Sequence, residues 1–239
     1  MRIVPLDSFP ADGHAIVSGE DARHFLRALR VRVGELWIAQ DRAGRRRRAR
    51  VAAAGKTEVE LELLEELDPF PRKAVPLWLA TAAPKGKLLS QLVRGCTEAG
   101  CDRLLPTRFA RSVRELEERA EERLRRCMHE AVKQCGLPET QTIAAPTDAL
   151  DLPAPPEVER VLFVAEVAAR PWIELARELP RERPWLLVIG PEGGFDAKEV
   201  RALGDPPSHR ASLGPQVLRL ETAAVVATAI AGQVLWTAR

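Results

Sequence analysis

The sequence predicts an α/β protein of two domains, a small β-rich domain followed by a larger domain built on a mainly parallel sheet. Three observations support this prediction. Residues 35–64 contain runs of alternating apolar and polar side chains, which are typical of strands. A stiff connector with two prolines follows at residues 68–71, and from residue 74 onward apolar strand-like runs alternate with helical patterns. We therefore place one domain at residues 1–70 and the second at residues 71–239.

In the first domain we expect one short helix and three strands. Apolar side chains recur at helical spacing over residues 21–30, and Gly34 separates this helix from the strands. The alternating runs lie at residues 35–40, 46–53 and 57–64. Because the runs are short and separated by turn residues, they are expected to form a small barrel or a curled sheet.

In the second domain the candidate strands are apolar runs at residues 75–81, 104–108, 161–165, 185–190 and 211–214. Helical periodicity covers residues 85–99 and 113–135. The longer of these helices has Ser112 and Glu115 at capping-box spacing before it and Gly136 as its stop. The proline-rich residues 146–156 are predicted to form a surface connector. Strands alternating with helices in this way indicate a parallel sheet.

Composition excludes several classes of protein. With 239 residues, 46% of them hydrophobic and 29% charged, the chain is long and apolar enough for a real core and is not disordered. Its N-terminus has no apolar run of the kind found in secretory signals. The longest uncharged stretch, residues 222–238, is short and contains Thr, Gly and Gln, so we expect a buried helix and no membrane span.

The four cysteines, Cys96, Cys101, Cys127 and Cys135, have spacings that match no zinc site and no redox pair. We expect free buried thiols in a cytoplasmic protein that binds no metal.

Positive charge is concentrated near the N-terminus. The net charge of the chain is only +2, but residues 1–56 contain 12 Lys and Arg against six Asp and Glu. Six arginines fall within residues 42–50. Guanidinium groups bind phosphate bidentately, and charges this dense repel one another unless a polyanion neutralises them, so we interpret the run as nucleic-acid-binding. The alternative is a solvated strand and turn.

A glycine-rich turn follows the strand predicted at residues 185–190. Its sequence is Gly190-Pro191-Glu192-Gly193-Gly194-Phe195, and Asp196 and Glu199 have the spacing of a capping box for a following helix. Loops at the carboxyl ends of parallel strands bind ligands in open α/β sheets, and glycines allow the backbone to approach a ligand closely. A purely structural turn remains the alternative.

A second turn follows the last predicted strand. Gly214-Pro215 leads into a short apolar loop and then into an Ala-rich helix that has Glu221 and Thr222 in its first turn. The alanines are typical of a buried helix. Arg219 and Glu221 are charges beside an apolar loop, and they are either functional or a structural pair at the start of the helix.

Together the two turns resemble those of the RsmE family, which methylates N3 of a uridine in 16S ribosomal RNA and belongs to the SPOUT class of methyltransferases. The resemblance rests on the pair of motifs, residues 190–195 followed by 213–215, 218–219 and 221–224. It extends to His24, Leu29-Arg30, Gly34, Lys85-Gly86, residues 97–100, Arg111-Ser112 and Gln134. Gln216 departs from the family, because an arginine is usual there.

The resemblance implies a C-terminal domain with a deep trefoil knot, an N-terminal PUA-like β-barrel and a homodimer. It implies S-adenosyl-L-methionine (AdoMet) as methyl donor and the uridine at position 1498 of 16S ribosomal RNA in the small subunit as target. The implied AdoMet-binding residues are Ala165, Glu166, Ile189, Gly190, Pro191, Glu192, Gly194, Leu213, Gly214, Val217, Leu218, Leu220, Thr222 and Ala223.

The same resemblance suggests roles for charged side chains. Arg219 would stabilise the anionic uracil or bind its phosphate, and Glu221 would orient the base or accept a proton. RNA would be held by Arg23, His24, Arg27, Arg30, Arg45, Arg46, Arg47, Arg48, Lys85 and Arg111. The alternatives are a related enzyme that acts on ribose 2′-hydroxyl or on transfer RNA, and a non-catalytic RNA-binding module.

Overall fold

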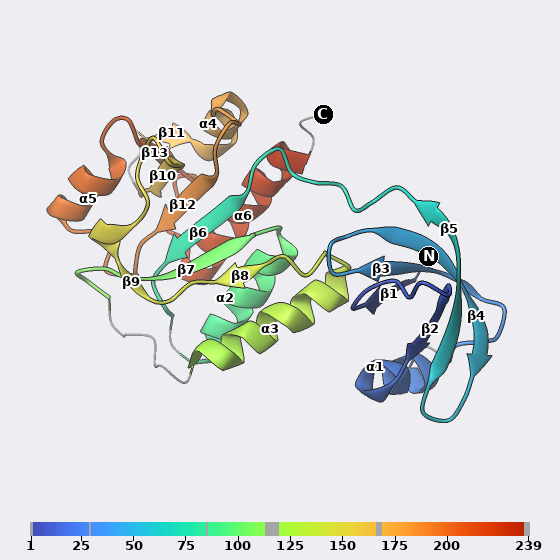
Figure 1. Cartoon of the computed structure of the whole chain (residues 1–239). Helices are drawn as coiled ribbons and strands as arrows, with labels where there is room; N and C mark the ends of the chain where they lie inside the picture. The colour runs from blue at the N-terminus through green and yellow to red at the C-terminus, as the bar shows by residue number, and fades with distance from the viewer. Residues whose placement is uncertain (1, 29, 85, 113–119, 166–168, 237–239) are drawn as a thin grey trace. The chain divides into compact units, whose positions relative to one another are not determined.

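The computed structural model describes residues 2–28, 30–84, 86–112, 120–165 and 169–236 (Figure 1). The chain divides into two compact units. One unit comprises Met1–Pro71 together with Lys133–Thr140, and the other comprises Arg72–Val132 and Gln141–Arg239. No sequence pattern indicated that residues 133–140 would join the N-terminal unit.

The first unit contains a five-stranded sheet with the order β1-β3-β4-β5-β2. In this sheet β1 pairs with β3 in parallel and the other pairs are antiparallel. The strands are β1 (Ile3–Leu6), β2 (His14–Val17), β3 (Leu36–Asp41), β4 (Arg46–Ala54) and β5 (Val59–Leu67). Three of them lie where the alternating runs predicted strands, whereas β1 and β2 were missed. Each missed strand has only four residues, and β1 contains a proline that cannot donate to a ladder.

The predicted helix over residues 21–30 is found in two parts, α1 (Gly19–Arg23) and a π-helical turn (His24–Ala28), while residue 29 lies outside the described residues. Phe25 packs edge-on against Trp37 of β3, with ring centroids 5.0 Å apart. Both side chains are buried in the core of this unit. The segment 133–140 joins the same unit, because Gln40 Nε2 donates a 3.0 Å hydrogen bond to the Gly136 carbonyl.

The second unit contains a parallel sheet with the order β11-β13-β10-β12-β6-β7-β8, and β9 also pairs with β7. Its strands are β6 (Leu77–Thr81), β7 (Arg103–Arg108), β8 (Thr142–Ile143), β9 (Thr147–Asp148), β10 (Glu159–Phe163), β11 (Arg170–Pro171), β12 (Trp185–Ile189) and β13 (His209–Ser212). All pairings among these strands are parallel, which confirms the predicted α/β class. The strands that were not predicted, β8, β9 and β11, have two residues each, too few for a pattern.

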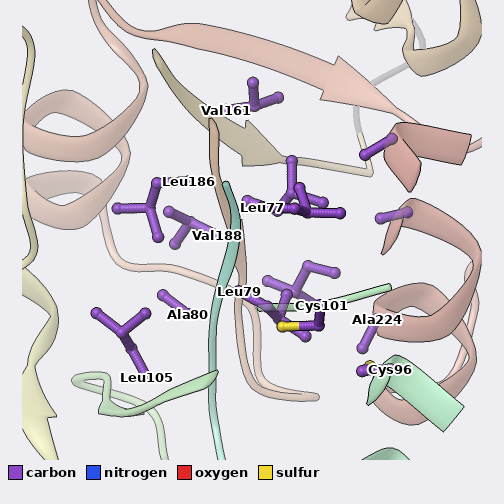
Figure 2. Packing of buried hydrophobic residues seen from close by; sticks show 14 of the residues in the cluster. Leu77, Leu79, Ala80, Cys96, Cys101, Leu105, Val161, Leu186, Val188 and Ala224 are labelled. Atoms are coloured by element: carbon purple, nitrogen blue, oxygen red, sulfur yellow. The ribbon is translucent and has the colours of Figure 1, made fainter. Parts of the chain in front are cut away.

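Helices cover this sheet. They are α2 (Lys87–Glu98), α3 (Ala120–Cys135), α4 (Trp172–Glu178), α5 (Ala197–Gly204) and α6 (Leu220–Trp236). Figure 2 shows Leu77 and Leu79 of β6 pointing toward Ala224 of α6, while Leu186 and Val188 of β12 point to the other side of the sheet. Strands buried on both faces explain the continuous apolar runs in the sequence.

Small residues allow α2 and α6 to pack closely. A Cβ on Gly232 of α6 would lie 2.6 Å from the carbonyl oxygen of Ala99, and a Cβ on Gly95 of α2 would lie 2.8 Å from Val225. The expectation of a buried, closely packed C-terminal helix is therefore confirmed for Leu220–Trp236. None of the described helices is long and apolar enough to cross a membrane.

Two local predictions need correction. Residues 146–156 are not simply a surface connector, because they contain β9 and a 3-10 helix (Ala149–Asp151), and Ala149 and Leu152 are buried in the core. The four thiols are not all buried either. Cys96 and Cys101 are buried, Cys127 is half-buried and Cys135, the last residue of α3, is exposed. The predicted capping box of α3 includes Glu115, which lies outside the described residues.

Candidate functional site

Three loops meet at one edge of the parallel sheet. We call them by the strands they follow: the β10 loop (residues 164–165), the β12 loop (residues 190–196) and the β13 loop (residues 213–219). Strands β13, β10 and β12 are neighbours in the sheet and run in the same direction. Their carboxyl ends therefore lie side by side, which is where open α/β sheets bind ligands.

The three loops enclose a cavity of about 540 Å³. This volume lies within the range of small-molecule and cofactor sites. Of the residues expected to bind a cofactor, the cavity is lined by Ala165, Ile189, Gly190, Pro191, Glu192, Gly194, Leu213, Gly214, Val217, Leu218, Leu220 and Ala223. Sequence reasoning did not assign the other lining residues, Phe163, Val164, Phe195, Val200, Ser212 and Gln216, to the site.

Other expected site residues lie elsewhere. Arg219 lines the cavity and is exposed, whereas Glu221 is half-buried and is not among the lining residues. Thr222 is exposed in the first turn of α6 and also does not line the cavity. Glu166 lies outside the described residues. Arg219 and Glu221 form no ion pair with each other in the described part of the chain.

The β12 loop is tightly folded around its glycines. The N–H of Gly194 donates a 2.8 Å hydrogen bond to the carbonyl of Pro191. Gly194 has φ +69°, a conformation that L side chains rarely adopt, and no neighbouring atom lies within 4 Å of the position of its missing Cβ. Gly190 faces the ring of Phe195 so closely that a Cβ would lie 2.7 Å from it. Of these two glycines, only Gly194 has open space at its Cβ position.

The β13 loop is held by a serine at the end of its strand. The Ser212 hydroxyl accepts from the N–H of Gly214 at 3.2 Å and donates to the Gly214 carbonyl at 3.1 Å. Gly214 has φ +126°, and its missing Cβ would lie 3.0 Å from Gln216 Oε1. After the loop, the Ala223 N–H donates to the Arg219 carbonyl at 2.8 Å, which begins α6.

A buried carboxylate connects the β12 loop to a fourth loop, the β7 loop (residues 109–112). Glu199 Oε2 accepts from the Asp196 N–H at 2.9 Å, and Asp196 Oδ1 accepts from the Glu199 N–H at 2.7 Å, which confirms the predicted capping box. Glu199 Oε1 also accepts from the Ala110 N–H at 2.6 Å. In addition, Arg111 Nη1 donates to the Gly193 carbonyl at 3.0 Å. The hydrogen bonds from Ala110 and Arg111 were not predicted.

Four of the six arginines of the run lie on β4, whereas Arg42 and Arg45 precede it, and acidic residues of the same unit neutralise much of the charge of the run. Arg48 pairs with Glu65 of β5, and Arg50 pairs with Glu62 of β5 at 3.2 Å. Other ion pairs join Arg45 to Asp41 at 2.6 Å and Arg42 to Asp7 at 2.6 Å and Glu139 at 3.3 Å. The argument that only a polyanion could neutralise these charges was therefore wrong, because β4 pairs with an acid-rich strand.

The two remaining arginines of the run also have partners within the unit. Arg46 Nε donates to Gln40 Oε1 at 2.8 Å, its guanidinium lies 4.7 Å from the ring centroid of Phe70, and partial burial lowers its pKa. Arg47 donates to the carbonyl of Leu64 through Nε at 2.8 Å and Nη2 at 2.6 Å. Much of the run thus stabilises the sheet.

A different group of basic side chains is exposed on the same unit. Arg23, His24, Arg27 and Arg30 are exposed on and after α1. Among the described residues, none of the three arginines has an acidic or hydrogen-bonding partner for its side chain. Lys85, also expected to bind RNA, lies outside the described residues, and Arg111 is exposed beside Gly193.

Residues 71–232 match the family described as RNA methyltransferase domain. The ribosomal RNA small subunit methyltransferase E of Mycobacterium bovis is 31% identical over 239 residues, covering 95% of this chain and 89% of the relative. The chain belongs to the RsmE family. The enzyme of that name from Bacillus subtilis is 24% identical over 88% of this chain and 86% of its own length.

Solved structures share the fold. The RsmE structure from Neisseria gonorrhoeae, described as bound to S-adenosyl methionine, has a TM-score of 0.80 and 23% identity and covers 99% of this chain and 98% of its own. A methyltransferase from Legionella pneumophila, described as in complex with the same cofactor, has a TM-score of 0.75 and 22% identity over 97% and 96%. The family prediction made from the two turns is therefore confirmed. Among the described residues, no cluster of His, Cys, Asp and Glu side chains could hold a metal ion.

Proposed function

We propose that the chain transfers a methyl group from AdoMet to N3 of a uridine in 16S ribosomal RNA, at the position numbered 1498. The observation that carries this proposal is the cavity formed by the β10, β12 and β13 loops in a member of the RsmE family. Two relatives, which are 31% and 24% identical to the chain, are described as ribosomal RNA small subunit methyltransferase E.

The residues of the cavity suit AdoMet. A nucleoside-containing donor needs an apolar slot for its ring and a few fixed polar groups, and Ile189, Leu213 and Leu218 provide apolar walls. Gly194 of the β12 loop leaves room for a ligand against its backbone, because it has open space where a side chain would be. AdoMet, when bound, supplies an electrophilic methyl group on a positively charged sulfur.

The chain's own residues would position the uracil and manage its proton. For N3 to bond to the methyl carbon, the N3–H bond must break and its proton must leave, and loss of this proton leaves negative charge on the base. The methyl–sulfur bond of the donor would break in the same transfer, with its electron pair remaining on the sulfur. Arg219, which lines the cavity and is exposed, would stabilise this charge or bind the phosphate of the target nucleotide. Glu221, two residues further on in α6, would orient the base or accept the proton. Such sites work mainly by positioning.

RNA would approach from cationic surfaces and the target base would leave its stack to reach the donor. Arg23, His24, Arg27 and Arg30 would contact phosphates, which fix the position of the RNA without choosing the base. We further propose that the N-terminal unit is a PUA-like RNA-binding barrel, that residues 71–239 form a knotted SPOUT domain, and that the enzyme works as a cytoplasmic homodimer with α6 at its two-fold axis.

Nucleoside analysis tests the reaction. Mass spectrometry of small-subunit ribosomal RNA from a deletion strain should show the loss of N3-methyluridine and its return when the gene is restored. An unchanged N3-methyluridine level together with loss of a 2′-O-methylated or transfer-RNA nucleoside would favour the related SPOUT enzyme instead.

Calorimetry with AdoMet tests whether the chain is an enzyme at all. A non-catalytic RNA-binding module would give no heat of binding with AdoMet, whereas the proposed enzyme should bind it with one site per chain. The purified protein should also transfer a labelled methyl group to small-subunit RNA from the deletion strain.

A further inference from the structure

We propose that Glu199 is a positioning residue for methyl transfer, because its buried carboxylate fixes the β12 loop to the β7 loop in the shape that binds AdoMet. This inference rests on the proposed function and adds to it a residue that does not line the cavity. Three sets of contacts between the two loops carry it.

The first contact set is the carboxylate itself. Glu199 is only 4% exposed, and its two oxygens accept from the N–H groups of two different loops, Ala110 at 2.6 Å and Asp196 at 2.9 Å. Hydrogen bonds to an ionised acceptor are stronger than those between neutral groups. A carboxylate accepts through both oxygens, whereas a carboxamide accepts through one and would turn an N–H toward the other amide. The site therefore requires a carboxylate.

The second and third sets of contacts join the same two loops beside the Glu199 carboxylate. Arg111 Nη1 donates to the Gly193 carbonyl at 3.0 Å, and the ring of Phe109 packs edge-on against Phe195 with centroids 5.4 Å apart. The β12 loop is thus held at Gly193, at Phe195 and at Asp196. Gly194 and Phe195, which lie between the outer two of these points, both line the cavity. The β7 loop acts as the outer support of the cofactor loop.

A helix cap alone does not account for these contacts. The reciprocal bonds between Asp196 and Glu199 are sufficient to cap α5. The bond from Ala110 comes from a residue 89 positions away, and it adds nothing to that cap. Its physical effect is to join two loops that follow different strands, β7 and β12. Loss of this bond should therefore alter the cofactor loop more than it alters the helix.

The test compares the full-length wild-type protein with Glu199→Gln. We expect the Kd for AdoMet, measured by calorimetry without RNA, to rise about tenfold, the loss of one strong hydrogen bond. In steady-state assays the KM for AdoMet should rise similarly, while kcat at saturating AdoMet stays within about twofold because the reacting groups are unchanged. Glu199→Asp, which keeps the charge but shortens the side chain, should recover part of the affinity.

Two further variants keep the result interpretable. Leu203→Ala removes a fully buried side chain from the same helix, so it should lower the melting temperature without changing the Kd for AdoMet. Arg111→Met removes the bond to Gly193 from an exposed side chain and should fold normally, with a rise in Kd of about threefold.

The outcomes separate the two proposals. If wild-type protein binds AdoMet and Glu199→Gln binds it equally well, the positioning role is wrong and the proposed function stands. Equal loss of AdoMet affinity in Glu199→Gln and Leu203→Ala would also overturn the positioning role of Glu199, because general destabilisation of the protein would then explain both losses. If the wild-type protein itself does not bind AdoMet, both the proposed function and the positioning role fail.

Discussion

Gly190 and Phe195 face each other across the β12 loop, and a Cβ on Gly190 would lie 2.7 Å from Cζ and 2.8 Å from Cε1 of the Phe195 ring. Real Cβ atoms do not approach other atoms this closely, so the ring could remain in place only with glycine at this position. The ring is in turn packed against Phe109, which limits its freedom to move. The observed position of the Phe195 ring therefore leaves no room for a side chain at Gly190, the first glycine of the motif.

Gly190→Ala is therefore expected to destabilise the protein and to weaken AdoMet binding. The added methyl group must displace the ring or the backbone, which costs about 1–3 kcal/mol in a well-packed site. Chemical denaturation and calorimetry would measure both effects. The double variant Gly190→Ala with Phe195→Leu should lose less than the sum of the single variants, since the smaller side chain relieves the clash. Strict additivity would contradict this account.

Gly194 permits a sharper comparison, because another glycine has almost the same φ. Gly194 has φ +69° and Gly19 has φ +68°, and neither has an atom within 4 Å of its missing Cβ. Replacing either by Trp imposes left-handed strain of about 1–2 kcal/mol. Only Gly194→Trp places its side chain in the cavity, so we expect its AdoMet affinity to fall at least about a hundredfold. Gly19→Trp should bind AdoMet as the wild type does.

Arginines with and without partners should contribute differently to RNA binding. Arg27 has no side-chain partner among the described residues, whereas Arg48 is engaged by Glu65, whose pKa its hydrogen bond lowers. Arg27→Gln should weaken binding to small-subunit RNA and reduce the salt slope of log Kd by about one. Arg48→Gln should have a smaller effect on the slope. Binding measured at several salt concentrations gives both slopes, and equal slopes would refute the distinction.

Elements of the fold were predictable where the sequence of a single strand or helix shows a clear pattern of apolar residues. Apolar runs such as residues 185–190 indicated strands because both faces of a parallel sheet are buried, and β12 is found at Trp185–Ile189. Strand β2 was not predictable, because it is short and places Ile16 outward with 64% exposure, which breaks the alternation. The strand order β13-β10-β12 depends on long-range pairing that no local pattern contains.

At the candidate site too, contacts between residues close in sequence were predictable, whereas contacts between distant residues were not. The capping box of Asp196 and Glu199 was visible because its two residues are three apart. The bond from Ala110 to Glu199, by contrast, joins residues 89 apart and has no local signal. The ion pairs of the arginine run were not predictable for the same reason, because Glu65 lies beside Arg48 only through the pairing of β4 with β5. Charge counts along the chain cannot show which charges lie opposite each other.

Arg219 should contribute to the chemical step more than Glu221 does. Arg219 is exposed at the cavity, and Glu221 is half-buried outside the lining. Removing one group that stabilises developing charge typically lowers kcat about 10²–10³-fold, and we expect such a loss for Arg219→Gln. Glu221→Gln should lose less. Single-turnover methyl transfer at saturating AdoMet measures this step, and a larger loss in Glu221→Gln would reverse the assignment.

The buried thiols should make stability depend on alkaline pH. Burial raises the pKa of Cys96 from 9.0 to about 12, and it raises the pKa of Cys101 as well. At a pH between the ordinary and the raised pKa, the thiol keeps its proton in the folded protein and has lost it in the unfolded chain. The free energy of unfolding therefore falls as pH rises, by about 1.4 kcal/mol per pH unit for each such thiol. Urea denaturation at pH 8 and pH 10 should show this decrease, and Cys96→Ala should reduce it.

Thiol labelling provides an independent check at constant pH. In native protein at pH 8, a thiol reagent should modify Cys135, which is exposed, and leave Cys96 and Cys101 unmodified, because burial both shields them and keeps them protonated. All four should react in denaturant. Rapid native labelling of Cys96 would show that the packing between α2 and α6 opens readily, and the decrease in stability above pH 8 should then be absent.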